Sequence, residues 1–116
     1  MEQLERRAGR TCDNLIEASV DTERTERICD LFRMLSEPSR LKIVLTLLGG
    51  ELCVYHILQA VGGTQSAVSH QLRILKDNRV LRARREGQNV YYSLADEHVR
   101  QMLAIGLQHS DCGGTI

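Results

Sequence analysis

The C-terminal part of the chain carries two pairs of side chains that are typical metal ligands. Asp96 and His98 form the first pair, and His109 and Cys112 form the second. His109 and Cys112 are three residues apart, so in a helix they share a face and can bind the same ion. Asp96 and His98 can converge as well if Asp96 lies just before the helix begins. Two imidazoles, a carboxylate and a thiolate in a tetrahedron suit Zn(II).

The spacing of the two pairs decides whether one chain can assemble all four ligands. His98 and His109 are eleven residues apart, which is about three turns and ~16 Å along a helix axis. One helix cannot bring both pairs to one ion, whereas two antiparallel copies can. The prediction is two equivalent intersubunit sites per homodimer, each with Asp96 and His98 from one chain and His109 and Cys112 from the other. In the alternative interpretation Asp96 is a helix cap, the histidines are exposed polar groups and Cys112 is a thiol at a frayed end.

A second candidate metal site lies near the middle of the chain. Cys53 and His56 are three residues apart on a predicted helix, and Cys12 in the N-terminal segment can complete a set that holds Zn(II) or Cd(II). The alternative is that Cys53 is a small core residue and His56 a surface polar group.

Basic residues concentrate between residues 64 and 92, although the whole chain has 15 Lys and Arg, 15 Asp and Glu and no net charge. This segment has six Lys and Arg but only Asp77 and Glu86 as acids, so it carries a charge of +4. A local basic block of this kind favours binding to a polyanion such as nucleic acid.

The spacing of apolar residues predicts the elements that position these groups. Four helices are expected, around residues 28–35, 38–48, 54–61 and 64–75. Gly62-Gly63 separate the last two, and two helices joined by a tight turn with glycine are typical of a helix-turn-helix. Period-two segments at 80–85 and 88–94 then predict a β-hairpin around a Glu86-Gly87 turn, and Asp96 opens a last helix. The expected fold is mainly α with a β-hairpin wing, a winged helix-turn-helix.

The second helix of the predicted helix-turn-helix presents polar side chains opposite its apolar stripe. Short polar side chains near a helix N-terminus suit contacts with base edges in a major groove, and cationic side chains suit phosphates. The alternative is a solvated polar face beside a solvated run of charges. The candidate DNA-binding residues are Gln65, Ser66, Ser69, His70, Gln71, Arg73, Lys76, Arg82, Arg84, Arg85 and Gln88.

Residues 34–94 resemble the ArsR/SmtB family of winged-helix metalloregulatory repressors. The matching stretches are Leu35–Leu41, Glu51–Val54, Ser66–Leu72 and Gly87–Tyr92. The resemblance implies a homodimer, joined through its N- and C-terminal helices, that binds a palindromic operator in double-stranded DNA. It also implies that an inducer metal releases the operator and so derepresses genes for metal efflux or sequestration.

The resemblance extends to both candidate metal sites, with departures. The spacing of the C-terminal pairs is similar to a terminal-helix zinc site in part of the family, where the last ligand is usually His or Glu. Cys112 stands there instead, which softens the site toward Cd(II) or another thiophilic ion. Family members that sense Cd, Pb or arsenic often carry Cys-x-Cys-x-Asp at the other site. Here Tyr55 replaces the second Cys and His56 replaces Asp, which weakens an arsenite interpretation.

Three other functions compete with metal sensing. A repressor switched by thiol oxidation would use Cys12, Cys53 and Cys112. A small thiol enzyme would use Cys53 with His56 as base, but no oxyanion device or third orienting residue is evident, so we do not expect an enzyme. A dimeric protein-interaction module with structural zinc is the third possibility.

The domain organisation expected from the sequence is simple. Residues 1–21 form an N-terminal arm, residues 22–110 the winged helix-turn-helix dimeric domain and residues 111–116 a tail. There is no run of ~18 apolar residues for a membrane span, and the charged N-terminus lacks an apolar signal region. We therefore expect a cytoplasmic protein without a membrane partner, whose thiols stay reduced.

Overall fold

The computed structural model describes Asn14 and residues 21–113, and it divides at Leu35 into two compact units. The first unit contains helix α2, Thr22–Leu35. Asp21 caps this helix, because its carboxylate accepts the backbone N–H of Arg24 at 3.1 Å. Apart from Asn14, the rest of the predicted arm, including Cys12, lies outside the described residues.

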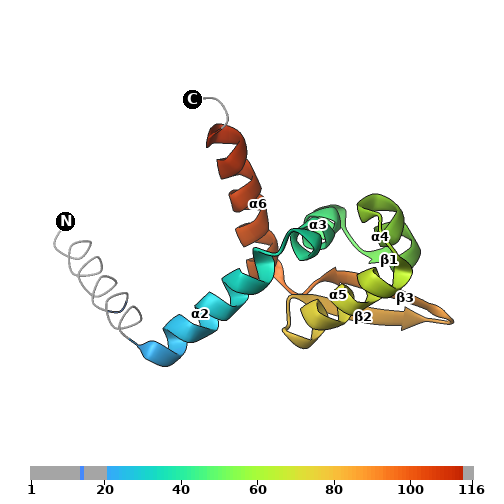
Figure 1. Cartoon of the computed structure of the whole chain (residues 1–116), viewed down its shortest axis with the longest axis horizontal. Coiled ribbons are helices and arrows are strands. Elements are labelled where there is room, and N and C mark those ends of the chain that lie inside the picture. Colours follow the sequence, from blue (N-terminus) through green and yellow to red (C-terminus); the bar gives the residue numbers. More distant parts are fainter. Residues whose placement is uncertain (1–13, 15–20, 114–116) are drawn as a thin grey trace. The chain divides into compact units, whose positions relative to one another are not determined.

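The second unit, residues 36–116, contains the helices predicted after residue 36 (Figure 1). Helix α3 begins with Pro38 in its first turn, and its cap Glu37 accepts the Arg40 N–H at 3.0 Å. Thr64 caps α5 in the same way, accepting the Ala67 N–H at 3.1 Å. The bounds are Pro38–Thr46 for α3, Leu47–Gly49 for the 3-10 turn η1, Val54–Val61 for α4, Gln65–Asp77 for α5 and Glu97–Gly113 for α6.

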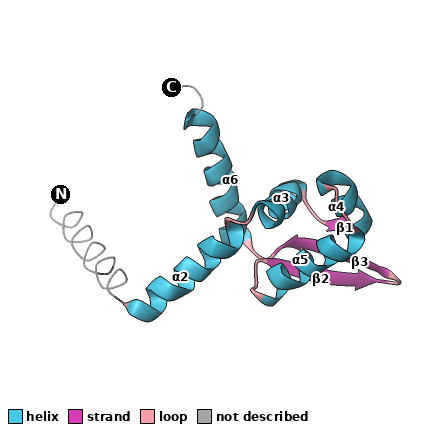
Figure 2. Ribbon diagram, in the orientation of Figure 1, coloured by secondary structure: helices cyan, strands magenta, loops and turns pink. Residues whose placement is uncertain are grey.

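The predicted hairpin is present, but it belongs to a three-stranded antiparallel sheet (Figure 2). Strands β2, Leu81–Glu86, and β3, Asn89–Leu94, pair from Leu81–Leu94 to Glu86–Asn89. The turn is therefore Gly87-Gln88, one residue later than predicted, with Gly87 at a φ of 63° that favours glycine. Strand β1, Leu52–Cys53, pairs with β3 and was not predicted, giving the order β1-β3-β2.

The core of the second unit is aliphatic. Its side chains pack α3, α4 and α5 against the base of the hairpin. None of the described polar or charged residues is buried. Burial of this apolar surface supplies the main driving force for folding. The completely buried large side chains are Ile43, Val44, Leu47, Ile57, Leu72, Leu75 and Val80.

Helix α6 contacts the rest of the second unit through its N-terminal half. The Arg100 guanidinium donates to the carbonyl oxygen of Leu48, and Leu103 is buried. Further along, Ile105 and Leu107 are 63% and 44% exposed. The helix continues to Gly113, past residue 110, the predicted end of the winged helix-turn-helix domain. The domain boundaries remain predictions. No described helix combines the length and apolar character needed to span a membrane.

The Thr64 cap yields a prediction about the stability of α5. Replacing Thr64 by Ala removes the side-chain acceptor for the Ala67 N–H, so the free energy of unfolding is expected to fall by about 1 kcal/mol. Thr64→Ser keeps the hydroxyl oxygen and should stay near the wild type. Urea unfolding followed by circular dichroism measures both variants, and equal stability of the two would contradict the assigned cap.

Candidate functional site

Helix α5 displays polar side chains on the side away from the core. Val68, Leu72 and Leu75 are buried, and their spacing turns the opposite face of the helix toward solvent. This face is available to a large partner because its predicted DNA-contacting members are all exposed: Gln65, Ser66, Ser69, His70, Arg73 and Lys76.

Gln71 differs from the other candidate residues on α5. It is half-buried, and its side-chain oxygen accepts the Arg40 Nε–H at 2.7 Å. The bond ties α5 to α3, so in this structure Gln71 contributes to the position of the helix. Arg40 is 31 residues away in sequence, and no local pattern pointed to it.

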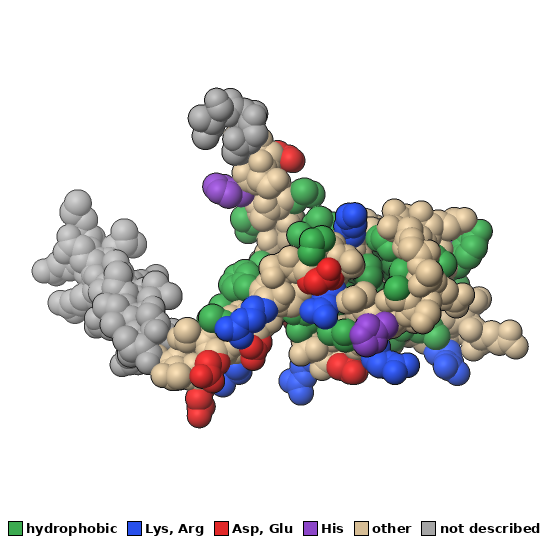
Figure 3. Space-filling model, in the orientation of Figure 1, with side chains coloured by type: hydrophobic (Ala, Val, Ile, Leu, Met, Phe, Trp, Pro, Cys, Tyr) green, Lys and Arg blue, Asp and Glu red, His purple; other side chains and the backbone are tan. Residues whose placement is uncertain are grey.

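The hairpin adds basic side chains to the same unit. Arg82, Arg85 and Gln88 are exposed on β2 and in the turn. Lys and Arg side chains appear in blue along the lower edge of the region that contains α5, β2 and β3 (Figure 3). Cations grouped in this way favour contact with a phosphate backbone.

Arg84 is the basic residue of the hairpin with the most partners. Its guanidinium contacts Glu51 Oε1 at 2.6 Å and Oε2 at 3.2 Å, and Glu86 Oε2 at 2.8 Å. It also lies 4.8 Å from the centre of the Tyr91 ring. Hydrogen bonding to Arg84 lowers the pKa of the Glu51 carboxyl. Glu51 lies just before β1, so this cluster connects the hairpin to the segment that leads into α4.

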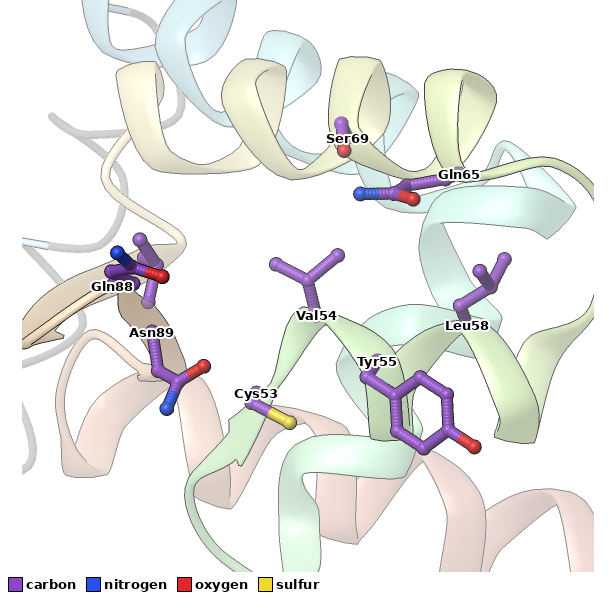
Figure 4. Close-up of a pocket in the computed structure, with 9 residues that line it drawn as sticks. Cys53, Val54, Tyr55, Leu58, Gln65, Ser69, Gln88 and Asn89 are labelled. Atoms are coloured by element: carbon purple, nitrogen blue, oxygen red, sulfur yellow. The ribbon is translucent and has the colours of Figure 1, made fainter.

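A cavity of about 340 Å³ lies between α4, α5 and the tip of the hairpin (Figure 4). Gln65 and Ser69 from α5 line it together with Gln88 from the turn, so three candidate DNA-binding residues border one space. The lining residues from α4 and the strands are Cys53, Val54, Tyr55, Leu58, Asn89 and Val90.

Cys53 and His56, the described part of the second candidate metal site, lie together at the start of α4. Cys53 is the N-cap residue, and its Sγ lies 3.2 Å from His56 Nδ1. His56 also makes an edge contact with the Tyr55 ring, with the ring centres 5.6 Å apart. The proposed third member, Cys12, lies outside the described residues.

The four C-terminal ligand candidates all belong to α6 and its cap. Asp96 accepts the Val99 N–H at 3.0 Å, and this hydrogen bond lowers the pKa of its carboxyl. His98 is 93% exposed, with Nδ1 at 3.6 Å from Asp96 Oδ1. His109 and Cys112 are exposed on the far half of the helix.

The exposed donors of α6 and its cap fit a metal ion in type, but the described residues do not bring all four together. Carboxylate and imidazole converge at the start of the helix, and imidazole and thiolate occupy positions three residues apart near its end. In the part of the chain that the structure describes, no group of three or more His, Cys, Asp or Glu comes together. Among the described residues, the four candidates on α6 and its cap therefore do not form a tetrahedral site within one chain.

Comparison with known proteins gives consistent matches. The sequence profile of bacterial regulatory proteins of the arsR family matches residues 37–83. A transcriptional repressor SmtB homolog from Synechocystis sp. is 45% identical over 77% of this chain and 70% of its own length. A cadmium resistance transcriptional regulatory protein CadC homolog from Staphylococcus aureus is 40% identical over 71% of this chain and 69% of its own.

Solved structures agree with the fold. The homodimeric winged helix-turn-helix DNA-binding domain of Mb0332 from Mycobacterium bovis has a TM-score of 0.70 and 31% identity, over 75% of this chain and 81% of the other. That domain is described as a possible ArsR-family transcriptional regulator. With the helix-turn-helix, the hairpin and the sequence matches, the chain belongs to the arsR family of bacterial transcriptional regulators, winged-helix DNA-binding proteins that are not enzymes.

Proposed function

We propose that this protein is a metal-responsive transcriptional repressor whose metal-free homodimer binds a palindromic operator. Zn(II), or Cd(II), bound between the C-terminal helices of the two chains lowers operator affinity and so derepresses genes for metal efflux or sequestration. The observation that carries the proposal is that one continuous helix, α6, together with its cap Asp96, carries both exposed ligand pairs. The protein acts in the cytoplasm, where its operator lies.

Dimerisation is supported by apolar side chains on both terminal helices. Ile105 and Leu107 on α6 are exposed, as are Ile28 and Phe32 on α2, which are 52% and 55% accessible. Large apolar side chains gathered on exposed helices favour association. The M. bovis domain is described as homodimeric, and we extend that state to this chain.

The ligand chemistry supports a thiophilic divalent ion. Two histidines, one aspartate and one cysteine from two antiparallel copies of α6 form a set that suits Zn(II), and the thiolate of Cys112 also favours Cd(II). The Synechocystis relative is named a repressor and the S. aureus relative a cadmium resistance regulator. The first name supports repression, and the second supports a response to a metal.

The coupling between metal and DNA acts through the geometry of the dimer. A homodimer presents two copies of α5, and operator binding needs them about one turn of DNA apart, ~34 Å. A metal that joins the two α6 helices favours a dimer geometry in which this spacing is lost. The coupling is reciprocal, so DNA must weaken metal binding by the same factor.

On DNA, the exposed residues of α5 contact base edges, and the cations of α5 and the hairpin contact phosphates. Gln65, Ser66, Ser69 and His70 lie near the N-terminal end of α5, the part of such a helix that enters the major groove. Arg73, Lys76, Arg82 and Arg85 supply the sequence-independent part of the affinity.

The first prediction separates DNA binding from metal sensing. His109→Ala should bind a DNA duplex, selected for affinity to the metal-free protein, with wild-type affinity. It should no longer release this duplex on addition of Zn(II), because one imidazole ligand is lost. Fluorescence anisotropy measures both properties, with Gln108→Ala as the exposed neighbouring control. Release by His109→Ala at wild-type zinc concentrations would exclude α6 as the sensor.

The second prediction tests whether each site is shared between two chains. An Asp96→Ala/His98→Ala chain and a His109→Ala/Cys112→Ala chain should each fail to bind zinc as homodimers. Mixed as a heterodimer, they bring together one complete site and should bind one zinc ion, half the wild-type amount. Zinc titration of the doubly tagged heterodimer measures this, and a heterodimer that binds none would contradict the intersubunit arrangement.

The third prediction concerns phosphate contacts by the hairpin. Arg85→Ala should lower DNA affinity and flatten the slope of log affinity against log salt by about 0.9, the value for one lost phosphate contact. Arg84 is neutralised by Glu51 and Glu86, so Arg84→Ala should change this slope less. Anisotropy titrations at several salt concentrations compare the two variants, and an Arg85→Ala slope equal to that of the wild type would remove Arg85 from the contacts.

A further inference from the structure

The tip of the hairpin extends beyond the third strand of the sheet. Strand β1 pairs with β3 only at Tyr91 and Tyr92, so residues 85–90 belong to a ribbon of two strands and its turn (Figure 2). A ribbon of this kind is marginally stable by itself. The tip carries Arg85 and Gln88, two of the candidate DNA-binding residues, so its direction decides whether they reach a duplex that is bound to α5.

Arg84 lies in the last row of the sheet that all three strands share. Its direct partner on β3 is Tyr91, which in turn pairs with Cys53 on β1. Paired residues of neighbouring strands project from the same face of a sheet, as do residues two positions apart on one strand. Arg84, Tyr91 and Glu86 therefore share a face. The Arg84 guanidinium lies 4.8 Å from the centre of the Tyr91 ring.

Glu51 connects this row to another part of the second unit. Both of its carboxylate oxygens accept from the Arg84 guanidinium, at 2.6 and 3.2 Å. Glu51 directly precedes β1 and α4, and Ile57 of α4 is completely buried in the core. An isolated ion pair on a surface contributes little, but a two-point contact between arginine and carboxylate within a network fixes geometry.

Glu86 binds the same guanidinium but cannot have the same effect. It contacts Arg84 at 2.8 Å, and it belongs to β2 itself, so this pair does not connect the hairpin to another element. The Glu86 side chain is also 68% exposed, against 35% for Glu51, so solvent screens its interaction more strongly. Of the two acids, only Glu51 can hold the hairpin in place.

We propose that Glu51 is a positioning residue for DNA binding. Through Arg84 it holds the hairpin tip in one direction before the duplex arrives, so that Arg85 and Gln88 meet the DNA already ordered. An element that is ordered in advance loses less conformational entropy on association. Arg84 keeps its contacts with Glu51 in the complex and makes no phosphate contact. The inference rests on the proposed contacts between the hairpin and DNA.

A positioning role and a purely electrostatic role of Glu51 predict opposite effects of its removal. An acid near the DNA surface repels phosphates, so charge alone means that Glu51→Gln raises DNA affinity. Positioning means that Glu51→Gln lowers the affinity, because the tip must then be ordered during binding. The phosphate contacts in the complex stay the same in number, so the slope of log affinity against log salt keeps its wild-type value.

Anisotropy titrations of the metal-free, full-length protein with the selected duplex test this role. Glu51→Gln should lower affinity at least threefold without a change of the salt slope. Added to Arg84→Ala, it should cause no further loss, because Glu51 acts through Arg84. The matched control, Glu86→Gln, should not lower affinity. Wild-type or higher affinity of Glu51→Gln, an equal loss in the Arg84→Ala background, or an equal loss for Glu86→Gln would overturn the proposal.

Hydrogen exchange of the DNA-free protein measures the order of the tip directly. Glu51→Gln should speed backbone amide exchange in residues 85–90 at least threefold and leave residues 65–77 of α5 at the wild-type rate. Unchanged exchange in the tip, or equally faster exchange in α5, would overturn the positioning role. A wild-type protein that binds no duplex would refute the proposed function and the role of Glu51 in DNA binding, whereas the exchange rates would still decide whether Glu51 holds the tip.

Discussion

Aliphatic packing between α3, α4 and α5 is the interaction on which the candidate DNA surface depends. Val68, Leu72 and Leu75 of α5 are buried in a core that also contains Ile43 and Ile57. Because the apolar stripe of a helix must face the core, its opposite face is fixed as soon as the core forms. No aromatic side chain and no buried polar group is among the described core residues. The shape and volume of the aliphatic side chains therefore determine the position of α5 in the unit.

Local sequence patterns predicted most of this fold, because its helices and caps depend on neighbouring residues. The apolar stripe of α5, the Thr64 cap, the Gly62-Gly63 break and the hairpin are all readable within a few residues. Strand β1 is only two residues long, too short to show alternation, and it exists because β3 offers it a pairing edge. The hairpin turn was misplaced by one residue because a Gly in either turn position of a two-residue loop is compatible with the same flanking sequence.

The candidate site was predictable in its residue types but not in its long-range contacts. Exposure of the α5 face and of the ligand pairs on α6 follows from helical periodicity. Arg84 with Glu51 and Arg40 with Gln71 join residues 33 and 31 positions apart, and charge counting alone treats such side chains as available to DNA. The shared border of Cys53, Gln65 and Gln88 likewise arises only when α4, α5 and the hairpin are packed together.

The unbroken course of α6 has a consequence for how this part of the chain can change during evolution. Each residue of a helix turns its successors by about 100°, so a single insertion or deletion between His98 and His109 would swing the second ligand pair to another side. Substitutions in this interval leave the angle unchanged. In related proteins that keep the same metal response, we therefore expect the residue types between His98 and His109 to vary more than the number of residues in this segment.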